Sequence, residues 1–214
     1  MIFLLLGYVV ILGSSFLFLE PQAIESLGKE HGVIENLSAF FLALSAGVTF
    51  IVWTKHKQKI SLALSFLLLC ACFRELDFHK EFTTMSILKS RFYLSPDVLI
   101  TEKVIGAIVI LLLASAAIYL ASQYKKVWAQ IIQKQAKVIS AITGIGIIAF
   151  AKFLDSSARI LPFTADYKAL HATNFMYLEE TLELLAAMVF VYAATLSLKK
   201  TGDEQTKLPH PQAQ

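Results

Sequence analysis

Three pairs of side chains that end in a carboxylate or an imidazole occur along this chain at a spacing of about one helical turn. They are His31 and Glu35, Glu75 and His79, and Glu179 and Glu183; the last pair is carboxylate only. Residues four apart lie on the same face of a helix. Helical bundles use carboxylates and imidazoles at this spacing to hold metal ions. The spacing therefore predicts a divalent-metal site where the helices bring these pairs together.

The predicted metal ligands are five side chains: Glu35, Glu75, His79, Glu179 and Glu183. A catalytic metal ion keeps one position open for water, and such an ion would suit hydrolysis of a lipid headgroup or acyl bond. In this hypothesis the catalytic residues are Glu75, Asp77 and Glu183. Asp155 and Glu180 are expected to belong to the same cluster, and His31 and His171 are expected to lie near it.

The depth of Glu75 follows from the length of its helix. The run 60–73 is apolar and is followed by the charged stretch 74–80. A membrane-spanning helix needs about 20 residues at ~1.5 Å each, so a span that starts at Ile60 ends near His79. The charged stretch is therefore expected inside or at the edge of the hydrocarbon. Ionisable groups at that depth normally face partners or a water-filled cavity.

Two other interpretations stay open. Several acids at one depth could hold and exchange protons, as in a proton or cation transporter, although the other halves of the helices show no matching relay. The charges could instead form ion pairs that fix the helices of a membrane scaffold or assembly protein. The expected pairs in that case are Arg74–Asp77, Asp155–Arg159 and Lys152–Asp155.

The elements that must position these residues are six apolar stretches, which predict an all-α bundle of six transmembrane helices within residues 1–198. The expected helices are 2–19, 30–53, 60–80, 95–122, 138–158 and a sixth from 166 or 173 to 198. The uncharged parts of the second, third and sixth are too short to span alone, so their acidic ends are drawn into the membrane. The polar tail 199–214 is expected to be disordered and cytoplasmic.

Composition and charge indicate where the protein lies. The 214 residues are 57% hydrophobic, and the mean hydropathy is +0.65. Segments 54–59 and 121–137 contain lysines but no acid, whereas all three arginines accompany the acids. By the positive-inside rule, the lysine segments and both termini are cytoplasmic, as in a multi-pass protein of the cell membrane, most simply the bacterial inner membrane. Membrane lipids are the expected partners and nucleic acid is not.

Segment 124–137 is expected to lie in the membrane interface on the lysine side, because it places Trp128 and two isoleucines among lysines. The oligomeric state does not follow from the sequence.

Overall fold

The computed structural model describes residues 1–28, 32–78, 83, 85, 87, 89–160 and 165–205; side chains within these ranges are described except at 21, 25, 155, 157–160, 165–172 and 200–205. All regular secondary structure in these ranges is α-helical, in agreement with the predicted fold class. The helices are α1 (Ile2–Phe18), α2 (Pro21–Gly28), α3 (Val33–His56), α4 (Lys59–Glu75), α6 (Ser90–Leu94), α7 (Ile100–Ser122), α8 (Tyr124–Ile132), α9 (Ala136–Ile160) and α10 (Ala165–Gln205).

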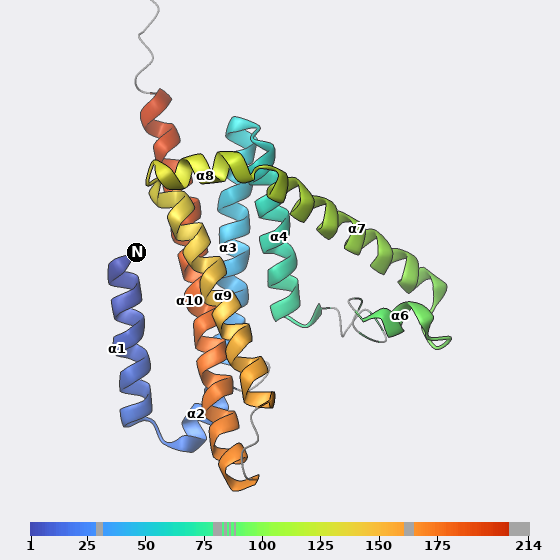
Figure 1. Cartoon of the computed structure of the whole chain (residues 1–214), viewed down its shortest axis with the longest axis vertical. Helices are drawn as coiled ribbons and strands as arrows, with labels where there is room; N and C mark the ends of the chain where they lie inside the picture. Colours follow the sequence, from blue (N-terminus) through green and yellow to red (C-terminus); the bar gives the residue numbers. More distant parts are fainter. Residues whose placement is uncertain are drawn as a thin grey trace, which may run out of the picture.

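The centre of the molecule is a bundle of α3, α4, α9 and α10 (Figure 1). Helix α10 packs against both α9 and α3, and α3 packs against α4. Small residues allow the close contact of α9 with α10, as is usual between membrane helices. A Cβ placed on Gly144 would lie 2.7 Å from the ring of Phe190, so only glycine fits there without movement of that ring.

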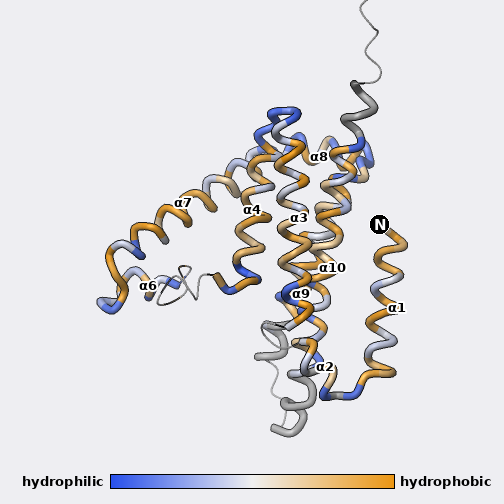
Figure 2. Tube along the Cα trace, turned by 180° about the vertical axis from the view of Figure 1, so that it is seen from behind, coloured by the Kyte–Doolittle hydropathy of each residue, from blue (hydrophilic) through white to orange (hydrophobic). Residues whose placement is uncertain are grey.

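Helices α1 and α7 lie outside this bundle (Figure 1). Helix α7 extends away from α4 at an angle, and its apolar side chains, such as Leu111 and Ile118, are largely exposed. Figure 2 shows hydrophobic residues along most of α1 and α7, with hydrophilic residues gathered at the ends of the helices. This surface is suited to lipid rather than to water.

Four helical stretches are long and apolar enough to cross a membrane: Gln22–His56 (which includes α3), Ile100–Ser122, Ala136–Leu154 and Thr173–Lys199. They correspond to the second, fourth, fifth and sixth predicted helices. Helices α1 and α4 have 17 residues each, fewer than the ~20 of a full span. Six membrane spans therefore stay a prediction.

The third predicted helix ends earlier than expected. Helix α4 stops at Glu75, and Leu76 and Asp77 form a turn in which Asp77 has a left-handed φ of 50°. Aspartate tolerates this conformation better than most residues because its short side chain can hydrogen-bond locally. Helix α4 is therefore shorter than the predicted helix, and the prediction that Glu75 and His79 share one helical face stays a prediction, because His79 lies outside the described residues.

The fourth predicted helix also begins later, at Ile100 rather than near Ser95. The hydroxyl of Ser95 accepts a hydrogen bond from the backbone N–H of Asp97, at 3.2 Å. It therefore stabilises a turn before the helix. The amino group of Lys103 donates to the Ser95 carbonyl at 2.7 Å, which ties this turn to the first turn of α7.

Candidate metal centre

Three glutamates from two antiparallel helices come together at one end of the bundle. Glu75 is the last residue of α4, and Glu180 and Glu183 lie in α10. One carboxylate oxygen from each lies within 4.8 Å of the other two. Glu75 and Glu183 are buried, and Glu180 is partly buried. We call these three residues the glutamate triad.

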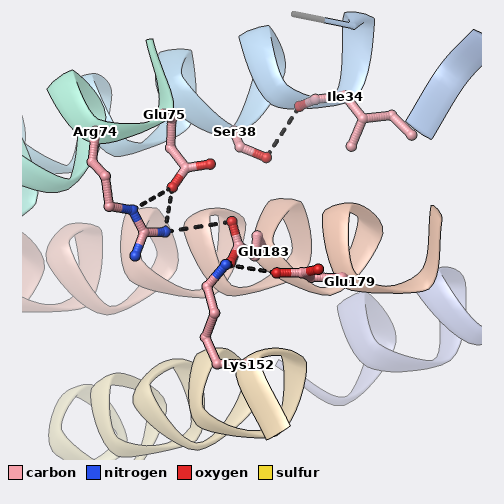
Figure 3. Close-up of polar contacts among 7 residues, drawn as sticks. All are labelled: Ile34, Ser38, Arg74, Glu75, Lys152, Glu179 and Glu183. Carbon is pink, nitrogen blue, oxygen red and sulfur yellow. Dashed lines mark hydrogen bonds and ion pairs between the residues drawn. The ribbon is translucent and has the colours of Figure 1, made fainter. Parts of the chain in front are cut away.

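Two bases hold the triad from its edges (Figure 3). Arg74 donates from Nε to Oε1 of Glu75 at 3.1 Å, and its Nη2 lies 3.5 Å from Oε2 of Glu183. Lys152, near the end of α9, places Nζ 2.6 Å from Oε1 of Glu179 and 2.6 Å from Oε1 of Glu183. Glu183 therefore links α10 to both α4 and α9.

The acids are inside and the bases are at the rim. The side chains of Glu75, Glu179 and Glu183 are 8%, 12% and 6% exposed, whereas those of Arg74 and Lys152 are 47% and 45% exposed. Long basic side chains can lie along the protein with their charged ends reaching inward. A cation or polar group that approaches the triad from outside meets these two bases first.

Negative charge exceeds positive charge among these side chains. Glu75, Glu179, Glu180 and Glu183 carry four negative charges when ionised, against the two positive charges of Arg74 and Lys152. Glu180 has the least compensation, because its Oε2 is buried and accepts no hydrogen bond within the described part of the chain. Four other glutamates are close enough to repel its charge: Glu35, Glu75, Glu179 and Glu183. The fully ionised cluster has a net charge of about −2, which one divalent cation would neutralise.

An apolar layer closes the triad on the side toward the other end of the bundle. Cys72 lies one turn before Glu75 on α4, and Ala187 lies one turn after Glu183 on α10. These two residues form a buried cluster with Ala39 and Leu42 of α3. A buried apolar layer at this position favours a site that opens to one side over a continuous polar path.

The structure brings part of the predicted ligand set together. Glu75 and Glu183 belong to the triad, and Lys152 joins Glu179 to Glu183. Glu35 lies in the first turn of α3, partly buried and within electrostatic reach of Glu180. Asp77 is in the turn that follows α4, and it is not a member of the triad.

The three predicted histidines cannot be placed in the site. His31 and His79 lie outside the described residues, and the side chain of His171 is also outside the described part. The side chains of Asp155 and Arg159 also lie outside the described part of the chain. The predicted ion pair between them therefore stays a prediction.

Two features of the site were not predicted. Glu180 was expected in the cluster but not among the metal ligands, although it lies three residues from Glu183, a spacing that places both on one helical face. The contact of Lys152 with Glu179 and Glu183 of α10 was also not predicted. The predicted pair of Lys152 with Asp155 stays a prediction, because the side chain of Asp155 lies outside the described part of the chain. Pairing between helices depends on their relative rotation, which one sequence does not reveal.

Comparison of the chain with known protein families, with curated proteins and with solved structures finds no match. The function must therefore be inferred from the chemistry of the site.

Proposed function

We propose that this chain is a multi-pass membrane protein in which the glutamate triad binds a divalent cation. The observation that carries the proposal is the approach of three carboxylate oxygens, from two buried residues and one partly buried residue, to within 4.8 Å of one another. Four helices of membrane-spanning length and apolarity support the membrane location.

The ligand atoms favour a hard cation. The triad offers carboxylate oxygens alone, and no cysteine or histidine of the described part joins it. Oxygen ligands suit Mg²⁺, Mn²⁺ and Ca²⁺, whereas zinc sites use mostly nitrogen and sulfur. The net charge of about −2 matches one such ion. We therefore propose Mg²⁺, Mn²⁺ or Ca²⁺.

The two bases occupy the oxygens that the ion would use. Arg74 and Lys152 contact Glu75 and Glu183 in this structure, so an entering cation must displace at least one of them. Both side chains are long and about half exposed, which allows them to turn outward toward water or lipid headgroups. On this view the bases offset the repulsion between the carboxylates until the ion binds.

The finer proposal is hydrolysis of a lipid-like substrate. A bound divalent cation supplies Lewis-acid polarisation to a carbonyl or phosphoryl oxygen. Once the ion displaces them, the charged ends of Arg74 and Lys152 would orient an anionic part of the substrate. Glu180, which has an uncommitted carboxylate oxygen, and the predicted catalytic residue Asp77 are the candidates to accept a proton from water. The apolar layer below the triad would exclude water from the opposite side.

Metal analysis of the purified protein tests the binding proposal. Elemental analysis before and after chelation should show about one equivalent of a divalent ion that the chelator removes and added Mn²⁺ restores. Glu75→Gln and Glu180→Gln each remove one ligand charge while keeping the side-chain volume, so both should lose the ion and remain folded. Glu20→Gln is the matched control, since Glu20 is exposed and lies outside the triad.

A structural role is the second candidate, because Arg74 and Lys152 join three helices through Glu183. In that case the wild type would bind no divalent ion at any concentration tested. Metal-free protein that carries protons across liposomes would instead support a transporter. Either result would overturn the metal-site proposal.

A further inference from the structure

Helix α8 has no buried residue, although six of its nine residues are apolar or aromatic. Tyr124, Trp128 and Ile132 follow one another at steps of four residues and are 63%, 63% and 67% exposed. They therefore form an apolar stripe on one face, which no described part of the chain covers. Short helices with an aromatic and aliphatic stripe beside lysines lie in the plane of a membrane interface.

Exposed lysines gather at the same end of the molecule as α8. Six of them come from the turn between α3 and α4 and from α8 and the segment after it: Lys55, Lys57, Lys59, Lys125, Lys126 and Lys134. Both views place α8 and the α3–α4 turn at the same end of the molecule, opposite the end of α4 that carries Glu75 of the glutamate triad (Figures 1 and 2). Residues 54–59 and 121–137 contain no acid, so these segments do not neutralise their own positive charge.

Aromatic rings accompany the lysines on both segments. The amino group of Lys57 lies 4.9 Å from the ring centroid of Trp53, and that of Lys125 lies 6.0 Å from the ring centroid of Tyr124. A shallow, open depression on the surface of α8 is lined by Tyr124, Lys125, Val127, Trp128 and Ile131. The depression therefore combines apolar walls with a cationic group at its edge, which matches the chemistry of a lipid headgroup joined to its acyl chains.

We propose that the surface formed by α8 and the α3–α4 turn binds anionic phospholipid headgroups in preference to zwitterionic ones. The aromatic and aliphatic stripe enters the acyl region, and the lysines contact the lipid phosphates. This inference rests on the membrane location proposed above, but it does not depend on a metal ion in the glutamate triad.

The two tryptophans of the chain, Trp53 and Trp128, both lie at this surface and report on it directly. The full chain is reconstituted, in chelator, into phosphatidylcholine vesicles that contain a small fraction of a dibrominated lipid. At equal fraction, dibrominated phosphatidylglycerol should quench tryptophan fluorescence more than dibrominated phosphatidylcholine does. The preference should fall as salt is raised, because the lysine–phosphate attraction is screened.

Substitution separates the surface from general attraction to the membrane. The double variant Lys125→Gln, Lys126→Gln should lower the preference for phosphatidylglycerol by roughly tenfold, given the typical strength of a lysine near an anionic surface. Lys89→Gln, an exposed lysine at the start of α6 on the other end of the molecule, should leave it unchanged. Equal quenching by the two lipids in the wild type, or an undiminished preference in the double variant, overturns the proposal. Absence of quenching by both lipids would overturn the membrane location as well.

Discussion

The two ends of the bundle carry charge in opposite ways. At the end with the glutamate triad, acids are buried between helices and two bases reach them from the rim. At the other end, lysines such as Lys57 and Lys125 are exposed, and their own segments contain no acid. Buried charges must be paired or neutralised, whereas exposed lysines remain solvated at little cost. Charge therefore determines helix packing at the first end and the attraction of partners at the second.

The comparison has a consequence for substitution. Removal of a charge from the triad either leaves a half-exposed base without its partner or relieves repulsion between buried acids, so stability should change. Removal of a lysine from the other end leaves no such group, and stability should change by less than about 0.5 kcal/mol. The three substitutions below test this difference at single residues.

Glu183→Ala should have the largest effect, because Glu183 contacts both Arg74 and Lys152. Loss of one member of a buried ion pair costs ~3–5 kcal/mol, and the half-exposed bases reduce this to about 2–3 kcal/mol. The expected result is a clearly lowered melting temperature in detergent, measured by circular dichroism or a thermal-shift assay. Lys57→Ala is the control at the other end. Equal melting temperatures for the two variants would contradict the proposed difference between the ends.

Lys152→Gln should have an intermediate effect that depends on metal. Without a divalent ion, the change leaves Glu179 and Glu183 with less positive charge, and the melting temperature should fall by the equivalent of about 1–2 kcal/mol, after allowance for the exposure of Lys152. A bound ion can replace the missing charge, so added Mn²⁺ should raise the melting temperature of this variant more than that of the wild type. Mn²⁺ affinity, measured by calorimetry, should rise by about tenfold or more, because a competing charge is gone.

Metal-independent destabilisation of Lys152→Gln would instead indicate that Lys152 serves packing alone. Lys89→Gln, which removes an exposed lysine outside the cluster, should change neither the melting temperature nor the response to Mn²⁺.

The sequence predicted the parts of this molecule that depend on local pattern. Apolar runs predicted the helices and the bundle, because a helix of this length in an apolar environment satisfies its own backbone groups. The same runs predicted that Glu75 and Glu183 lie at the same end of the bundle. The depth of each residue follows from the number of apolar residues in its helix, and the two helices are antiparallel. Six spans were predicted as well, but 17-residue helices such as α1 do not meet the length criterion.

The details of the site depended on features with no local signature. The end of α4 at Glu75 follows from the left-handed turn at Asp77, where the sequence contains no glycine or proline to indicate it. Arg74 contacts the adjacent Glu75, although neighbours in a helix do not normally face each other. The pair forms because both side chains extend from the last turn of α4 toward α10. Rotation of α9 and α10 about their axes, which selects Glu179 and Glu183 as partners of Lys152, is also determined only by packing.

Glu180→Gln should give the smallest effect and the opposite sign. Glu180 has a buried oxygen that accepts no hydrogen bond from the described residues, and unlike Glu75 and Glu183 it has no ion pair with a base among them. It is also repelled by four glutamates. In chelator, the amide removes this repulsion and can donate a hydrogen bond to a neighbouring carboxylate, so the melting temperature should rise by the equivalent of about 0.5–1 kcal/mol. With Mn²⁺ the order should reverse, because the wild type gains stability from the bound ion and the variant has lost a ligand. Lys57→Gln, an equal change of charge at the exposed end, should leave the melting temperature unchanged in both conditions. A fall in the melting temperature of Glu180→Gln in chelator would mean that its carboxylate has a cationic partner, and the excess of negative charge that favours a metal ion would then be absent.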